Sequence, residues 1–312
     1  MESAAVRRAP NLPGAVQLGL IFALILLAAV SWAVTDDRMS GMDAGPGTDP
    51  GSFGFWVTAW VVMMAAMMFP SVAPTVLMQA RIEEGKRRQG VETEAGTTAF
   101  FVCGYLLTWT AAGLLAYGLI KLGKELSPGF LAWDEAGPYV AGGVIIAAAI
   151  YQLTPLKDVC LRHCRTPMTF LLMHWRPGRG GALLMGIEHG GWCVGCCWGL
   201  MAALIALGVM SIGWMVFVAA LIAIEKLLPW KNVANRGIAV TLLVLGLAVA
   251  FTPEDVPGLT LPDSPEAQAA MESMGMDDDG MSDDGAMPEK QMPEKQMPES
   301  AGGKKMPGDS MP

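Results

Sequence analysis

Five chemically active side chains lie close together within one strongly apolar stretch of the chain, namely Glu188, His189, Cys193, Cys196 and Cys197. Thiol and ionisable groups are costly in hydrocarbon and usually mark a functional site there. Thiolate sulfur and imidazole nitrogen are ligands for metal ions such as Cu(I) and Zn(II). The pattern therefore predicts metal binding inside a membrane helix.

The spacing of these residues predicts a shared cavity. On a helix, residues three, four, seven or eight positions apart lie on one face, and His189, Cys193, Cys196 and Cys197 follow this spacing. One helix rarely supplies every ligand, because its side chains stack in a column, so a donor from another helix is expected. Glu188 lies off this face and is a weaker candidate, for proton handling or for supporting the ligands. Cysteines also occur in cores as small apolar side chains, which is the alternative interpretation.

A second apolar segment carries the predicted partner of these cysteines. Met64, Met67 and Met68, with Met63 as a weaker candidate, precede Pro70. Helical rise places them and the cysteines within about 5–8 Å of one another in membrane depth. Methionine at this spacing also fills cores, and that alternative stays open.

Further candidates are weaker. Cys160, His163 and Cys164 have i, i+3, i+4 spacing in a predicted loop and would form a compact soft site if that loop is helical. Glu225 could neutralise a cation or relay protons, but its lysine neighbour favours the interpretation as an interfacial pair at a helix end. Cys103 is expected to pack rather than to bind.

Hydropathy predicts the elements that position these residues. The 312 residues are 53% hydrophobic and 16% charged, whereas soluble domains are about 25% charged. A membrane span needs about 20 apolar residues. Seven segments qualify, at 16–34, 54–79, 97–120, 138–154, 182–208, 211–228 and 236–252. The predicted fold is an all-α membrane bundle of about seven helices over residues 16–252, preceded by a short terminus at 1–15.

Two further patterns concern how the bundle is arranged. Gly191, Gly195 and Gly199 have a spacing that lets a neighbouring helix approach closely. Lysine and arginine are concentrated in alternate loops, which predicts a multi-pass protein of the plasma (inner) membrane with a cytoplasmic N-terminus and an external C-terminal tail.

The tail, residues 253–312, is rich in Pro, Gly, Asp and Glu and is predicted to be disordered. Its repeat places methionine every five residues, at Met287, Met292 and Met297. Thioethers bind Cu(I) well and Zn(II) poorly, so the tail, with Met39 and Met42 of the first external loop, is expected to collect metal. An acidic solubilising tail is the alternative.

Other classes of function are disfavoured. The net charge of −8 arises mainly in the tail, and the chain has no basic stripe for nucleic acid. We find no phosphate-binding glycine loop, serine triad or zinc-protease helix. No cysteine lies in a predicted external loop, so structural disulfides are not expected.

Several of these motifs together resemble a prokaryotic family of predicted metal-binding integral membrane proteins, some of which are labelled predicted copper chaperones. The resemblance covers residues 55–230 and rests on W-V-V-M-M-A-A-M-M-F-P at 60–70, E-H-G at 188–190, C-V-G-C-C-W at 193–198 and E-K at 225–226. It implies metal binding at Cys193, Cys196 and Cys197 with His189.

The sequence therefore predicts a non-enzymatic membrane protein that captures a soft metal, with Cu(I) favoured over zinc, and hands it to a periplasmic or membrane copper-receiving protein. Two alternatives remain. Cys193 and Cys196 form a CxxC pair that a membrane dithiol–disulfide relay would use. The chain would otherwise be an assembly or accessory subunit of a membrane copper enzyme.

Overall fold

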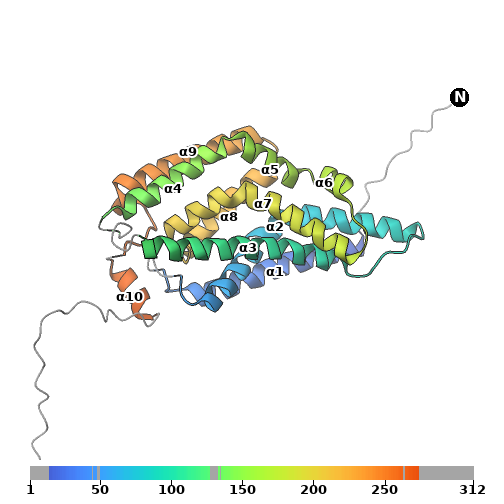
Figure 1. Ribbon diagram of the computed structural model, residues 1–312, viewed down its shortest axis with the longest axis horizontal. Coiled ribbons are helices and arrows are strands. Elements are labelled where there is room, and N and C mark those ends of the chain that lie inside the picture. The colour runs from blue at the N-terminus through green and yellow to red at the C-terminus, as the bar shows by residue number, and fades with distance from the viewer. Residues whose placement is uncertain are drawn as a thin grey trace, which may run out of the picture. The chain divides into compact units, whose positions relative to one another are not determined.

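The computed structural model describes residues 14–43, 45–47, 50–126, 133, 135–262 and 264–273. These residues are mostly helical and contain no strand (Figure 1). The helices are α1 (Ala15–Met39), α2 (Phe53–Arg88), α3 (Thr97–Leu126), α4 (Gly137–Gln152), α5 (Pro155–Arg165), α6 (Pro167–His174), α7 (Gly178–Gly208), α8 (Ile212–Leu227), α9 (Lys231–Phe251), the 3-10 turn η1 (Pro253–Asp255) and α10 (Pro265–Ser273). The predicted all-α class is confirmed.

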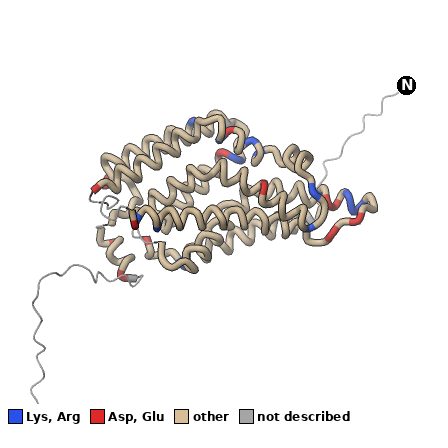
Figure 2. The backbone as a smooth tube through the Cα atoms, viewed as in Figure 1, with Lys and Arg blue, Asp and Glu red and all other residues tan. Residues whose placement is uncertain are grey.

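The long helices are compatible with a multi-pass membrane protein. In the described part of the chain, α1, α2, α3, α7 and α9 are long and apolar enough to span a membrane, and α4 with α5, bent by 68°, raises the number to as many as six. Helix α8 has only 16 residues, so the span number of seven stays a prediction. Figure 2 shows long stretches of α2, α3 and α4 without any charged residue.

Helix α7 carries the cysteines and packs along α3, α4 and α5 (Figure 1). Its contact with α3 depends on glycine. A Cβ atom on Gly186 would clash with the Phe101 carbonyl, and one on Gly104 would clash with the Leu183 carbonyl. This close approach lets α3 reach the cysteine-bearing part of α7.

Gly191, Gly195 and Gly199, here called the glycine seam, were predicted to allow close approach of another helix, and only two of them do so. A Cβ atom on Gly195 would lie 2.8 Å from the Cys160 sulfur on α5, and one on Gly199 would lie 3.6 Å from the Ala148 Cα atom on α4. Nothing lies within 4 Å of such an atom on Gly191. The seam therefore receives α4 and α5, while the contact with α3 uses a different face of α7.

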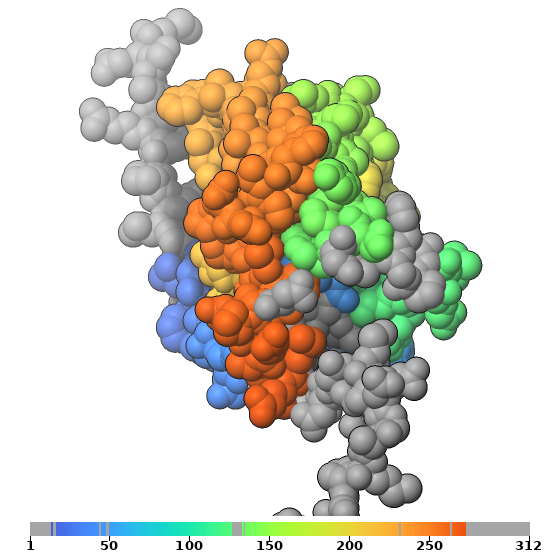
Figure 3. All heavy atoms as spheres, turned by 90° about the vertical axis from the view of Figure 1, so that its left-hand side faces the viewer, coloured from blue at the N-terminus to red at the C-terminus, as the bar shows by residue number. Residues whose placement is uncertain are grey.

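The prediction of disorder from residue 253 onward begins too early. The segment after α9 contains η1 and α10, and Val256 and Leu259 are buried. The Thr260 hydroxyl donates to the Asp43 carboxylate at 3.1 Å, which joins this segment to the loop after α1. Figure 3 shows residues 253–273 in orange and red beside the blue N-terminal elements. The tail methionines Met287, Met292 and Met297 lie outside the described residues.

Candidate metal centre

Helix α7 presents three cysteines to the interior of the bundle. Cys193, Cys196 and Cys197 are all buried, as the predicted shared face requires. The segment is rich in glycine yet remains helical, because backbone groups in hydrocarbon must satisfy their hydrogen bonds internally. The Cys196 sulfur lies 3.4 Å from the Cys197 sulfur, so the two neighbouring thiols point into one space.

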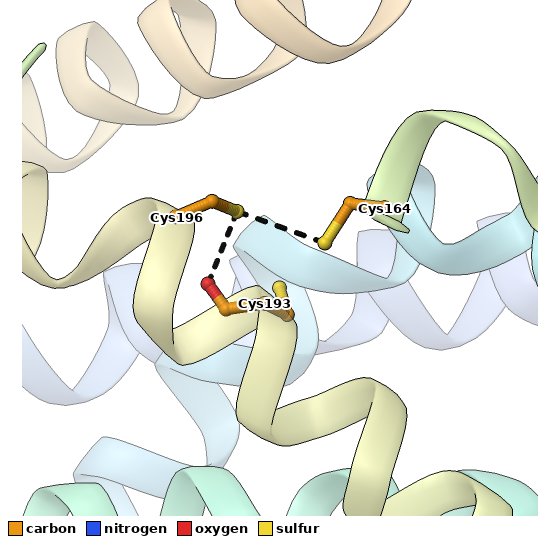
Figure 4. Close-up of side chains that lie close together, drawn as sticks. All are labelled: Cys164, Cys193 and Cys196. Carbon is orange, nitrogen blue, oxygen red and sulfur yellow. Dashed lines mark hydrogen bonds between the residues drawn. The ribbon is translucent and has the colours of Figure 1, made fainter. Parts of the chain in front are cut away.

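A second helix supplies a further sulfur to these cysteines, that of Cys164 on α5. Its sulfur lies 3.7 Å from the Cys196 sulfur, and the close-up view shows the two side chains reaching toward each other (Figure 4). The sulfurs of Cys164, Cys193 and Cys196 all lie within 4.8 Å of one another. Two sulfurs that share a metal at about 2.3 Å are at most about 4.6 Å apart. Small side-chain adjustments therefore suffice for all three to bind one ion.

The α5 residues do not form the self-contained site that their spacing suggested. The loop is helical as required, but Cys164 joins the α7 cysteines and Cys160 packs against Gly195. The His163 ring stacks on Trp192 at 4.1 Å, and its Nδ1 donates to the Val159 carbonyl at 2.9 Å. The bend between α4 and α5 explains the outcome, because it lays α5 against α7.

A cation and a phenol contact Cys193. The Lys226 ammonium donates to the Cys193 sulfur at 3.1 Å, and the Tyr105 hydroxyl lies 3.1 Å from the same sulfur. Lys226 also reaches the Ser71 hydroxyl at 3.4 Å. An adjacent cation favours the thiolate, which is the form that binds metal. The site therefore holds charge compensation for a thiolate ligand.

A buried ion pair lies next to the cysteine cluster and contacts its backbone. The Lys157 ammonium lies 2.8 Å from the Glu225 carboxylate, and the two side chains are 1% and 0% exposed. Lys157 also donates to the Cys196 carbonyl at 2.6 Å. The interpretation of Glu225 as an interfacial pair with its neighbour is therefore wrong. Its partner is Lys157, and the pair ties α5, α7 and α8 together at the cysteines.

Glu225 also belongs to a second group of possible ligands. One of its carboxylate oxygens and the sulfurs of Cys196 and Cys197 lie within 4.8 Å of one another. The carboxylate already accepts hydrogen bonds from Lys157 and from the Gln152 amide. The group with three sulfurs is therefore the simpler metal site.

His189 lies one turn before Cys193 but belongs to neither group of three. Its Nε2 is 3.4 Å from the Thr75 hydroxyl, and its ring packs against Phe101 and Phe170. Its Nδ1 is buried without a hydrogen-bond partner among the described residues. The structure therefore does not place His189 with the sulfur ligands, although it leaves one ring nitrogen unused.

The predicted methionines line the interior of α2. Met63, Met64, Met67 and Met68 are all buried. The Ser71 hydroxyl donates to the Met68 carbonyl at 2.9 Å and lies 3.9 Å from the Met68 sulfur. Because Ser71 also contacts Lys226, a continuous series of contacts joins Met68 to Cys193.

Two other candidates lie apart from the cluster. Glu188 pairs with His174 at 3.2 Å and with Arg176 at 3.7 Å, so it connects α7 to the segment around α6. Cys103, expected to pack rather than to bind, is exposed on α3. Neither residue contributes to the two groups of possible ligands.

Sequence reasoning missed the lysines of the site. Lys157 lies in a segment predicted as a loop and Lys226 was interpreted as an interfacial residue, but both side chains point inward. A lysine within or beside an apolar span is itself a signal of function. Applied to Lys226, that rule would have indicated a buried anionic partner.

Together, the helical fold and the buried sulfur cluster describe a protein that is compatible with membrane insertion and whose cysteines could hold a metal ion. A family model described as copper chaperone (PpoB2) matches residues 57–249, which is more than half of the chain. The protein therefore belongs to this copper chaperone family. No curated protein and no solved structure matches the chain. The matched region includes α2, α5, α7 and α8, and it extends beyond the predicted limit of residue 230.

Proposed function

We propose that this protein is an integral membrane copper chaperone that holds Cu(I) at Cys164, Cys193 and Cys196 and passes it to a receiving protein. The observation that carries the proposal is the convergence of these three sulfurs within 4.8 Å of one another, from two helices. Cys197 stands next to the cluster as a further sulfur for ligand exchange. The family description supports a carrier role rather than catalysis.

The donor set supports Cu(I) over zinc. Sulfur ligands suit Cu(I), and structural zinc sites usually take four ligands in a closed tetrahedron. Here the carboxylate within reach is held by Lys157, and the histidine lies outside the group. Buried thioethers on α2 extend the sulfur-rich surroundings. The ligands that the site offers are therefore mainly sulfur atoms.

Handover requires a route out of the cluster. Cys164 is only partly buried and lies on α5, whereas Cys193 and Cys196 are buried on α7. An incoming thiolate from a membrane partner replaces one sulfur at a time, so the ion never leaves its ligands for water. We assign Cys164 to this exchange step, in a plasma-membrane protein with the predicted orientation.

Metal titration tests the proposal. The full-length protein in detergent should bind Cu(I) in competition with a Cu(I) chelator, and C193S combined with C196S should abolish the high-affinity part of this binding. C103S is the matched control, because Cys103 is exposed and away from the cluster. Unchanged competition in the double variant would overturn the proposal.

A dithiol relay is the second candidate, because the Cys164 and Cys196 sulfurs lie only 3.7 Å apart. Exchange with a partner disulfide would oxidise these two thiols and reduce the partner to two thiols. Reversible formation of a Cys164–Cys196 disulfide in metal-free protein, detected by mass spectrometry, would favour the relay. Its absence under mild oxidation, together with Cu(I) binding, would favour the chaperone.

A further inference from the structure

A second cavity, lined in part by methionines, lies nearer the beginning of α2. It is lined by Met39 at the end of α1, Met63 on α2 and Met210 in the turn between α7 and α8. All three side chains are buried. Met39 was expected in an external loop, but α1 extends to this residue and turns it inward. Three distant parts of the chain thus bring thioethers to one cavity.

Two tryptophans complete the cavity wall. Trp56 and Trp60 line it and stack on each other at 5.5 Å. Their indole N–H groups donate elsewhere, to the Gly113 and Trp109 carbonyls, each at 2.9 Å. Aromatic faces attract cations, and thioethers are neutral soft ligands. With no acidic residue in its lining, the cavity suits a soft monovalent cation better than a hard divalent one.

The volume of the cavity is suited to a single small ion. Its volume is about 10 Å³, which is near the minimum that holds one water molecule. Methionine side chains are flexible and adapt to a guest without large backbone movement. A single ion without its hydration shell is therefore a suitable occupant.

A larger cavity adjoins this one and offers an approach. It has a volume of about 230 Å³ between α1 and α2, and Met39 lines both cavities. Thr35 also lines it, and the Thr35 hydroxyl is buried with no partner among the described residues. Arg38 also lines this larger cavity. Its charge repels a divalent cation about twice as strongly as a monovalent one.

Helix α2 connects the cavity to the cysteine cluster. Met63 lies one helical turn from Met67, and Met68 contacts Ser71, which reaches Lys226 beside the cluster. From residue 63 to residue 71 the helix rises about 12 Å. Four buried methionines, at residues 63, 64, 67 and 68, lie within this interval.

We propose that Met39, Met63 and Met210 form a separate loading site for a monovalent soft cation, Cu(I) or Ag(I), which then moves along the α2 thioethers to the cysteines. The destination of the ion rests on the proposed function, but binding at the thioether site does not. The step is ligand exchange without oxidation or reduction. In the predicted orientation, the loading site lies toward the external side.

Ag(I), which mimics Cu(I) without redox chemistry, is the probe. The full-length protein is loaded with Ag(I), washed with excess free methionine and analysed for retained silver. M39L combined with M63L and M210L should retain one ion fewer than wild type. M201L combined with M215L is the matched control, because these buried methionines line neither cavity. Leucine conserves volume and usually costs little stability in a core.

The two hypotheses fail separately. Equal silver retention in the triple variant and wild type would overturn the loading site and leave the cysteine site standing. Equal retention in C193S/C196S and wild type would overturn the cysteine site alone. If the triple variant does not fold, M63L provides the measurement. It should weaken retention of the loading-site ion by about tenfold, and unchanged retention would overturn the inference.

Discussion

The cysteine cluster and the thioether cavity are both buried and sulfur-lined, yet their surroundings differ. The cluster has Lys226 and Tyr105 on one sulfur and the Lys157–Glu225 pair behind it. The thioether cavity is lined by methionine, tryptophan and other apolar side chains. A thiolate in a protein interior needs a compensating charge, whereas a neutral thioether needs none. If both regions bind metal as proposed, we expect a tighter, proton-coupled site at the cluster and a weaker site at the cavity that is insensitive to protons.

Acid should separate the two sites most strongly. Metal binding to thiols releases protons, and each displaced proton weakens binding about tenfold per pH unit below the range in which the thiol ionises. With two protons displaced, binding at the cluster should weaken by up to about 10⁴-fold from pH 7 to pH 5. Silver in the thioether cavity should stay bound, because thioethers do not take up protons in this range.

Equilibrium Ag(I) titrations at several pH values check this prediction, with C193S/C196S reporting the thioether cavity alone. A pH-independent affinity in the wild-type protein would contradict the thiolate assignment. A strong pH dependence that persists in the double cysteine variant would place a titrating ligand at the other site.

Replacing Lys226 should affect one site only. K226M removes the ammonium that donates to Cys193. Hydrogen bonds to charged groups contribute about 1.5–3 kcal/mol, so cluster affinity should fall by about 10- to 100-fold. The thioether cavity should be unaffected, because Lys226 does not line it.

Chelator competition with Cu(I) measures the change at the cluster, and K226R is the control that retains the charge. Equal losses in K226M and K226R would indicate that shape rather than charge matters at this position. Equal affinity in K226M and wild type would mean that the cluster needs no compensating charge from α8.

The difference between the two regions also explains which of their residues could be predicted from the sequence. The cysteines on α7 share a face that helical periodicity alone predicts, and their burial follows from the apolar segment around them. The methionine cavity combines residues from α1, α2 and the turn before α8. Such a combination depends on how helices pack, and local spacing contains no information about it.

The bend between α4 and α5 was likewise not predictable from local spacing, and it led to a wrong assignment of the α5 residues. The sequence predicted a loop between the apolar segments at 138–154 and 182–208, and a helix is observed there at Pro155–Arg165. Lys157 within it lies in a buried pair with Glu225. A charge count cannot distinguish a lysine in water from one paired in the interior, so Cys164 was assigned to a separate site.

A substitution between the two regions should change rates more than affinities. Met68 lies in the interval between the thioether cavity and the cluster and contacts Ser71, but it belongs to neither binding group. M68L preserves volume and apolar contact, so Ag(I) affinity at each site should change by less than about threefold. Transfer of Ag(I) from the loading site to the cysteines should slow, because one intermediate ligand is lost. Stopped-flow absorption of the silver–thiolate bands measures this rate, with M201L as the control on α7. An unchanged rate would mean that the ion reaches the cluster without using the thioether at Met68.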